Sequence, residues 1–378
     1  MRGKSAKLLV TLSACALAEA AAAQCSYQMD LVSAFEAIGQ PVVGEQQLPG
    51  NGWRFMRSTN ALSAPTPLSG VLIANFGAWG DPTQPFSVPL VGPIYSPNAS
   101  RNQIPFYRRT PSFEGLMCHP GYSDISSEVF LVPQASLTMT SVRVRGELLG
   151  WASPNAIIGA SIVNSGGVNT TVFTDRSILS LAPAIDLGSS DLQIGMPYPI
   201  NAGDKLRLRV TNGGDPSEDW VNATISVTVE GAPTIIAMPR NVTIGGPTSG
   251  TFRVRAAGST GYRWYRYGEA LSDGPTSTGA VLSGTHSAEL TITNAFFDDA
   301  GDGYRCVVSN NCGSVTSTNA ALSICPSDFD GNGFITFDDF DAFVSAFEGG
   351  DATSDFNHDG FLTFEDFDAF VSAFESGC

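Results

Sequence analysis

The chain has 378 residues, of which 43% are hydrophobic and 15% charged, and it contains 40 glycines and 23 prolines. This length predicts two or three domains, and the composition is typical of a turn-rich, mainly β globular protein rather than a disordered chain. The formal net charge is −16 and the chain holds only three lysines, so it has no basic stripe that could neutralise a phosphate backbone. Nucleic-acid binding is therefore disfavoured.

The first segment of the sequence has the pattern of an export signal. Basic residues precede an apolar run over residues 8–23, which ends in three alanines of the kind that signal peptidase cleaves after. We therefore predict a signal peptide over residues 1–23 and a mature chain that starts at Gln24. An alternative is lipidation of Cys15, because the residues before it resemble a bacterial lipoprotein box. No later stretch reaches the 18 apolar residues that a membrane helix needs, so we expect a secreted or cell-surface protein without a transmembrane helix.

Six cysteines remain after the predicted signal peptide, an even number that suits disulfide bonds in an oxidising compartment. Six cysteines allow 15 pairings, and the domain boundaries given below favour the pairs 25–118, 306–312 and 325–378. No histidine flanks them at metal-ligand spacing, which argues against zinc binding and thiol catalysis. The predicted disulfide cysteines are Cys25, Cys118, Cys306, Cys312, Cys325 and Cys378.

The last part of the sequence contains two copies of one unit. Residues 328–350 and 355–377 are identical at 17 of 23 positions, at an offset of 27 residues. Each copy opens with oxygen-bearing side chains at positions 1, 3 and 5 and a glycine at position 6, so that alternate side chains of a tight loop converge on one hard cation. The predicted ligands of two calcium ions are Asp328, Asp330, Asn332, the carbonyl of Phe334, Thr336 and Asp339 in the first copy, and Asp355, Asn357, Asp359, the carbonyl of Phe361, Thr363 and Asp366 in the second.

An apolar stripe follows each loop, with phenylalanine or valine at i, i+3, i+4 and i+7 from Phe340 and again from Phe367, which predicts one helix per copy. Two loop–helix units without an entering helix, and with aspartate at position 12, resemble the dockerin module of bacterial surface and polysaccharide-degrading systems. The resemblance covers residues 326–378, and the final Gly377-Cys378 resembles the variant at the C-terminus of exported planctomycete-type proteins. It implies a calcium-dependent module that docks the chain on a cohesin-like or other surface receptor.

Loop positions 10 and 11, where dockerins contact cohesins through small polar residues, are occupied here by Phe337-Asp338 and Phe364-Glu365. This departure argues against an ordinary cohesin partner. The tail also holds 12 of the 23 phenylalanines of the chain, more than so small a module can bury. We therefore expect some of these side chains to face a partner.

Residues 233–325 alternate between short apolar strands and turn clusters, which predicts an antiparallel sandwich. The spacing of Trp264, Tyr304 and Cys306 resembles an immunoglobulin domain, with Trp264 in the core and Tyr304 as the corner tyrosine. The second strand has no cysteine, so that Val254 or Ala256 should face the core and Cys306 lacks the usual partner. A hairpin disulfide to Cys312 resembles that of bacterial immunoglobulin-like repeats. Such a domain is usually a spacer or an adhesive surface.

Residues 24–232 show strand-like alternation, for example over 137–149 and 206–210, and no helix of useful length is evident. The half over residues 137–232, with NAGDKLRLRV followed by an acidic turn and a last strand, resembles carbohydrate-binding jelly-roll sandwiches, which implies that the domain binds glycan. Four tryptophans could stack on sugars or belong to the core: Trp53, Trp79, Trp151 and Trp220. An oxygen-rich turn could hold a further calcium ion through Asn212, Asp215, Glu218 and Asp219.

A catalytic function has little support in the sequence, which contains no nucleophile elbow, zinc-protease helix or phosphate loop. None of the three histidines, His119, His286 and His358, can be paired with a nucleophile. A pair of glycosidase carboxylates stays open, from Glu114, Asp124, Glu128, Glu147, Asp215 and Asp219. We predict an exported, surface-anchored, noncatalytic binding or adhesion protein; the alternative is a polysaccharide-degrading hydrolase displayed through the same tail.

Overall fold

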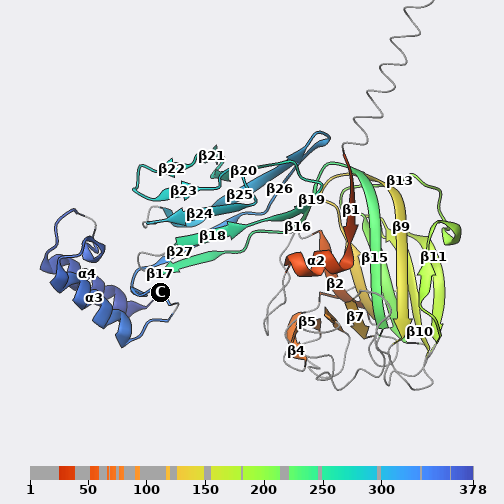
Figure 1. Ribbon diagram of the computed structural model, residues 1–378, viewed down its shortest axis with the longest axis horizontal. Helices are drawn as coiled ribbons and strands as arrows, with labels where there is room; N and C mark the ends of the chain where they lie inside the picture. The colour runs from red at the N-terminus through yellow and green to blue at the C-terminus, as the bar shows by residue number, and fades with distance from the viewer. Residues whose placement is uncertain are drawn as a thin grey trace, which may run out of the picture. The chain divides into compact units, whose positions relative to one another are not determined.

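The computed structural model describes residues 25–38, 52–58, 66–67, 69–73, 76–80, 90–93, 116–119, 126–148, 155–179, 182–212, 221–245, 249–295, 299–332, 334–357 and 359–377. The fold is mainly β, with antiparallel sheets and a small helical tail, as predicted (Figure 1). The chain divides into two compact units. The first unit contains residues 1–237, 255–260 and 309–315, and the second contains residues 238–254, 261–308 and 316–378.

Two antiparallel sheets form most of the first unit. One sheet joins β1 (Ser26–Asp30), β4 (Ser69–Ile73), β5 (Phe76–Gly80), β6 (Leu90–Pro93), β7 (Leu116–His119), β9 (Leu137–Leu148), β12 (Ile185–Leu187), β13 (Tyr198–Ile200) and β15 (Val221–Gly231). The other joins β2 (Trp53–Ser58), β3 (Thr66–Pro67), β8 (Ser126–Leu131), β10 (Asn155–Val163), β11 (Asn169–Leu179) and β14 (Lys205–Asn212). Buried residues of both sheets belong to one hydrophobic core, as in a sandwich.

The strand order of this sandwich is that of a jelly roll. The first sheet contains the order β12, β9, β15, β7 and the second contains β11, β10, β14, β8, so that the chain crosses between the sheets as two Greek keys. Strands β12 and β13 both pair with β9, along its other edge from β15. The predicted jelly-roll sandwich is therefore confirmed.

Strand β14 shows how the sequence pattern produces this fold. Leu206, Leu208 and Val210 are buried in the core, whereas Arg207 and Arg209 alternate with them. Because successive side chains of a strand point to opposite faces, the two arginines lie together on the outer face of the sheet. The alternation predicted for this strand is therefore confirmed.

A short helix, α2 (Leu31–Ile38), follows β1, where we expected no helix of useful length. Leu31, Ala34 and Phe35 are buried at the i, i+3 and i+4 spacing of one helical face. The Asp30 carboxylate accepts a hydrogen bond from the Ser33 N–H at 2.8 Å, which supplies an N-terminal cap. Eight residues give too little periodicity to be recognised in the sequence.

The immunoglobulin-like part contains two larger sheets. One joins β17 (Val242–Gly245), β20 (Gly261–Arg266), β21 (Glu269–Ala270), β25 (Gly301–Asn310), β26 (Gly313–Thr316) and β27 (Ala320–Cys325). The other joins β18 (Ser249–Arg253), β22 (Gly274–Pro275), β23 (Val281–Ser283) and β24 (Glu289–Thr293). Strand β17 runs parallel to β27, and a separate pair is formed by β16 (Thr234–Ala237) and β19 (Arg255–Ala257).

The core of this domain uses the residues predicted for it. Trp264 is fully buried and its indole N–H donates to the Ser287 carbonyl oxygen at 2.9 Å. Tyr304 is also buried, stacks on Phe252 at 4.8 Å, and donates its hydroxyl to the Asp299 carbonyl oxygen at 2.8 Å, as a corner tyrosine does. Val254 lies between β18 and β19 and is fully buried, so that the core has a valine where a cysteine usually stands.

The structure corrects the predicted disulfide between Cys25 and Cys118. Cys25 is bonded to Cys312, with a Cα–Cα distance of 6.0 Å. The predicted pair is excluded because β1 and β7 meet opposite ends of β15: Ser26 lies opposite Glu230, and Cys118 lies opposite Val221. At the rise of a β-strand, these ends are about 30 Å apart.

The predicted pair of Cys306 and Cys312 is also wrong, because Cys312 is bonded to Cys25. Cys306 is fully buried on the core face of β25, whereas Cys312 is exposed in the turn before β26. Cys118 and Cys306 are both free thiols, and burial raises the pKa of each to about 12. Cys325 is disulfide-bonded. Cys378 lies outside the described residues, so its pairing with Cys325 stays a prediction.

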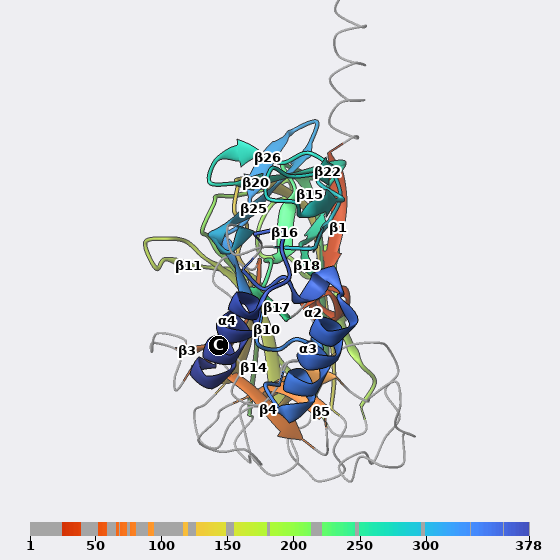
Figure 2. The same ribbon diagram turned by 90° about the vertical axis from the view of Figure 1, so that its left-hand side faces the viewer.

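The tail contains two equivalent helices, α3 (Phe337–Gly349) and α4 (Phe364–Ser376), joined through the short 3-10 helix η4 (Ala352–Ser354) (Figure 2). The predicted helix in each copy is therefore confirmed. Their shared core is centred on Phe329, Phe343 and Phe370.

Candidate metal centre

Each tail helix begins at the end of a predicted calcium loop, and the same two residue types make its N-terminal cap. The Thr336 hydroxyl accepts the Asp338 N–H at 3.2 Å, and Asp339 accepts the Thr336 N–H at 2.8 Å. Thr363 and Asp366 repeat the arrangement at 3.2 and 2.8 Å. These capping boxes place the carboxylate of position 12 at the start of the helix and facing back into the loop.

The first loop brings three predicted ligands together. Carboxylate oxygens of Asp328, Asp330 and Asp339 lie within 4.8 Å of one another. Asp328 and Asp339 are buried, whereas Asp330 is exposed. The second carboxylate oxygen of Asp339 accepts the Thr336 N–H, and the first accepts the Asp330 N–H at 3.1 Å. Three oxygens at this spacing, with backbone support, suit a calcium ion.

The remaining predicted ligands of the first loop make local hydrogen bonds. The Asn332 side chain donates to Asp330 at 2.7 Å and accepts the Phe334 N–H at 2.8 Å. The Thr336 hydroxyl serves as the helix cap described above. The structure therefore gathers the three carboxylates and holds the neutral side chains of Asn332 and Thr336 in local hydrogen bonds.

The second loop repeats this geometry with two ligand types exchanged: Asn357 stands where the first loop has Asp330, and Asp359 stands where it has Asn332. Asp366 accepts the Asn357 N–H at 3.0 Å, and Asp359 accepts the Phe361 N–H at 2.8 Å. One oxygen of Asp355 accepts the Gly360 N–H at 2.9 Å, and the other is buried without a hydrogen-bond partner. Within the described part of the chain, the close carboxylate triad occurs in the first loop alone.

The charges of the loops favour a bound cation. From Pro326 onward the chain has 13 acidic residues and no lysine or arginine. Burial opposes the negative charge of Asp366, but hydrogen bonds from backbone N–H groups, including those of Thr363 and Asn357, outweigh it and lower its pKa. A carboxylate kept ionised among other carboxylates is stabilised by a divalent ion, and the oxygen donor set fits calcium.

Four phenylalanines of the tail remain exposed, as the composition predicted. Phe334 and its equivalent Phe361 are 73% and 71% exposed, and Phe337 and Phe364 are each 79% exposed. They occupy positions 7 and 10 of the two loops, so the duplication produces two equivalent aromatic edges beside the cation loops. Exposed aromatic side chains of this size are typical of an interaction surface.

Two of the six candidate glycosidase carboxylates have described side chains, Glu128 and Glu147, and they do not form a pair with each other. Glu128 lies on β8 and Glu147 on β9, which belong to different sheets, and neither residue belongs to the hydrophobic core between them. Their side chains point to opposite outer faces, with sheets about 10 Å apart between them, a separation that does not suit either glycosidase geometry. Asn212 ends β14, but its side chain lies outside the described part, as do Glu114, Asp124, Asp215, Glu218, Asp219 and the four tryptophan side chains of the sandwich.

Of the three histidines, only His286 has a described side chain. His286 is exposed and contacts Arg263. His358 lies outside the described residues, and His119 is described only as the last residue of β7. The interpretation that no histidine is paired with a nucleophile stays a prediction.

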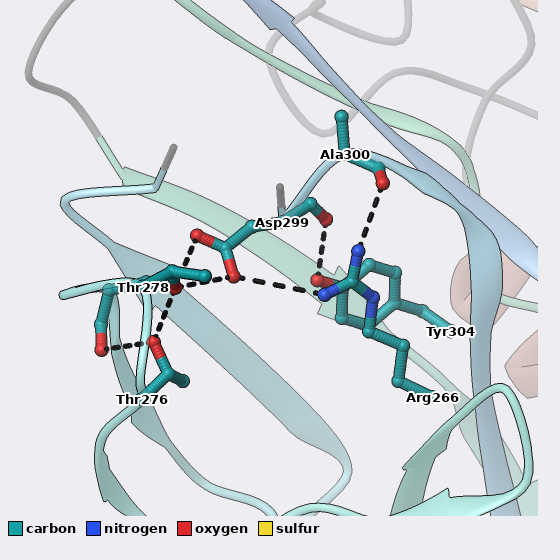
Figure 3. Close-up of polar contacts among 7 residues, drawn as sticks. Arg266, Thr276, Thr278, Asp299, Ala300 and Tyr304 are labelled. Atoms are coloured by element: carbon teal, nitrogen blue, oxygen red, sulfur yellow. Dashed lines mark hydrogen bonds and ion pairs between the residues drawn. The ribbon is translucent and has the colours of Figure 1, made fainter. Parts of the chain in front are cut away.

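A second polar cluster lies in the immunoglobulin-like domain (Figure 3). The Thr278 hydroxyl donates to the Asp299 carboxylate at 2.9 and 3.0 Å, and Arg266 lies 3.8 Å from it. Arg266 also donates to the Ala300 carbonyl oxygen at 2.9 Å, and its guanidinium lies over the Tyr304 ring. These hydrogen bonds and the ion pair join members of the cluster to one another. The arrangement stabilises the segment before β25 and is therefore structural.

The immunoglobulin-like part is similar to domains of known proteins. Residues 233–324 match the model of the immunoglobulin I-set domain. Similar solved structures include titin M4, with 27% identity, and titin M3, with 25% identity, each over 25% of this chain and 96% of that chain, at TM-scores of 0.20 and 0.21. The Ig1-2 module of the Drosophila receptor protein tyrosine phosphatase DLAR is 15% identical over 45% of this chain and 83% of its own, at a TM-score of 0.21.

A search of the curated proteins found no match. Among the helices of the described structure, none is long and apolar enough to cross a membrane. An immunoglobulin-like domain is typical of a noncatalytic binding or adhesion protein, and the Cys25–Cys312 bond is typical of proteins from oxidising compartments.

Proposed function

We propose that this is an exported, noncatalytic binding protein held at a cell surface by its tail. In this proposal each tail loop binds one calcium ion, and the tail docks on a cohesin-like or other surface receptor as dockerins do. The immunoglobulin-like domain acts as a spacer or adhesive module, and the jelly-roll sandwich binds glycan. The resemblance to planctomycete-type exported proteins supports surface display.

One observation carries the docking proposal: the first loop combines a carboxylate cluster with exposed phenylalanines, and the second loop repeats the exposed phenylalanines. Asp328, Asp330 and Asp339 meet at a spacing suited to calcium, and Phe337 lies on the adjoining helix turn with 79% of its surface exposed. Calcium neutralises the clustered carboxylates, which stabilises the loops and the helices that they cap. The ordered loops then present the phenylalanines to an apolar surface on the receptor.

The test is calcium titration of the full chain by calorimetry, with hydrogen exchange to locate the change. We expect two ions per chain and slower exchange over residues 328–377 when calcium is present. No binding, or binding without added protection of the tail, would contradict the calcium-dependent anchor.

Docking is tested separately with the calcium-loaded chain and cell envelopes from the source cells. We expect retention that is reversed by a chelator and lost in the double variant Phe337→Ser and Phe364→Ser. The matched control is Val168→Ser, which removes an exposed apolar side chain from the sandwich. Equal retention of all three proteins would show that the tail does not dock through these residues.

A further inference from the structure

A polar pocket lies on the outer face of the second sheet of the sandwich, over β10, β11 and β14. It has a volume of about 250 Å³, and its polar lining includes Ser161, Asn169, Thr171, Asp175, Arg207 and Arg209. All of these residues belong to the first unit. The size of the pocket suits a single small ring rather than an extended chain.

Two arginines of β14 form the basic part of the pocket. Arg207 donates from Nε to the Ser161 hydroxyl at 3.0 Å, and its Nη1 lies 3.6 Å from the buried Glu128 carboxylate. Arg209 donates to Asp175 at 2.6 Å. The arginine side chains are only 13% and 20% exposed. Their guanidinium groups are thus held in place before any ligand arrives, which lowers the entropic cost of binding.

The guanidinium donors of the lining favour an anionic group. The lining contains two arginines and the Asp175 carboxylate, and the buried Glu128 carboxylate beside Arg207 balances the second arginine charge. The Asp175 side chain is 52% exposed, so a ligand can reach both its carboxylate and the Arg209 guanidinium beside it. Guanidinium groups recognise carboxylates through paired hydrogen bonds, and partial burial makes such bonds stronger than in water.

A glycine in β10 makes room for this arrangement. The pairing of β10 with β11 shifts register between Ile158 and Ala160, so that Gly159 lies at a bulge. A Cβ atom at Gly159 would overlap with the Asp175 carboxylate. Bulges of this kind redirect side chains next to binding sites.

We propose that the pocket binds a carboxylated sugar, a uronic acid unit of a glycan, an inference that rests on the glycan-binding role proposed above for the sandwich. The sugar carboxylate pairs with Arg207 and Arg209. The Asp175 carboxylate accepts hydrogen bonds from sugar hydroxyls, and Asn169 and Thr171 at the rim supply both donors and acceptors.

The test compares the binding of trigalacturonic acid with that of a neutral hexose trisaccharide to the full chain by calorimetry. We expect the acidic trisaccharide to bind at least about tenfold more tightly, the difference that one charged hydrogen-bonded pair supplies. Arg209→Gln should weaken binding of the acidic sugar by a similar factor. Arg209→Lys, which keeps the charge without the paired geometry, should also weaken it.

The matched control is Arg176→Gln, which removes the same charge from exposed β11 without altering the pocket lining, and which should bind as the wild type does. Circular dichroism of each variant checks that the sandwich is folded. Equal affinity for acidic and neutral sugars, or an equal loss in both glutamine variants, would overturn the inference while leaving the glycan role intact. Failure of the wild type to retain any polysaccharide would overturn the glycan role and this inference with it.

Discussion

Phe343 and Phe370 stack face to face, with ring centroids 4.0 Å apart and an interplanar angle of 4°. They are equivalent positions of the two tail copies, and the surrounding contacts come in matching pairs: Phe337 meets Phe374 at 6.2 Å, and Phe347 meets Phe364 at 6.0 Å. The duplication has therefore built one core from two copies of the same helix, related by an approximate twofold axis.

Phe343→Ala and Phe370→Ala should destabilise the tail by the same amount, about 3–5 kcal/mol each, because each removes one half of the same buried stack. Hydrogen exchange of peptides covering α3 and α4, in the calcium-loaded full chain, measures the loss. Phe337→Ala is the control, and its 79% exposed side chain should contribute little to stability. Unequal effects at positions 343 and 370 would contradict the shared core.

Asp339→Asn should reduce the number of bound calcium ions from two to one, because it removes a charged oxygen from the closest carboxylate cluster. Asp366→Asn should do the same at the second loop. Asp341→Asn is the matched control, since it removes one negative charge from an exposed position of α3. Calorimetry counts the ions, and an equal decrease in the Asp341 variant would show that only bulk charge attracts calcium.

The free thiols should make stability depend on pH. Burial raises the pKa of Cys118 and Cys306 to about 12, above the value of about 8.5 in an unfolded chain. The stability that the buried neutral thiols contribute is therefore fully present below about pH 8.5 and decreases as the pH rises toward 12. The reason is that the thiols ionise at a lower pH in the unfolded chain than in the folded protein. Urea unfolding between pH 8 and pH 10 measures the decrease, and Cys306→Val should make it smaller. A pH-independent unfolding free energy would contradict the burial of these thiols.

Asp299→Ala should destabilise the immunoglobulin-like domain by about 3 kcal/mol, because it leaves Arg266 without its carboxylate in a largely buried position. Asp299→Asn should cost less, since an amide oxygen still accepts from Thr278. Asp302→Asn removes the same charge from an exposed position of β25 and serves as the control. Hydrogen exchange over β24 and β25 measures each change, and a silent Asp299→Ala would show that the cluster is not structural.

Local patterns predicted the parts of the fold that depend on neighbouring residues. The alternation of β14, the two tail helices, and the burial of Trp264 and Tyr304 follow from periodicity and spacing within short segments. The gathering of Asp328, Asp330 and Asp339 likewise depends on one loop. The residues that determine each of these features lie in one short segment, so the pattern of that segment was enough to predict the feature.

The features that escaped prediction depend on strand register between distant segments. The partner of Cys25 could not be found from spacing, because β1 and β7 share one edge of β15 but meet opposite ends of it. The pocket was missed for the same reason: Arg209 and Asp175 meet only through the pairing of β14 with β10 and of β10 with β11. Their residue types alone indicated a solvated strand face.

The bond between Cys25 and Cys312 spans 287 residues of sequence, including the whole jelly roll. If tension is applied between Cys25 and the tail, the covalent path from Cys25 passes directly to Cys312 and bypasses every strand of the sandwich. The strands of the jelly roll then carry none of that tension. A proteolytic cut anywhere between the two cysteines would leave both fragments joined.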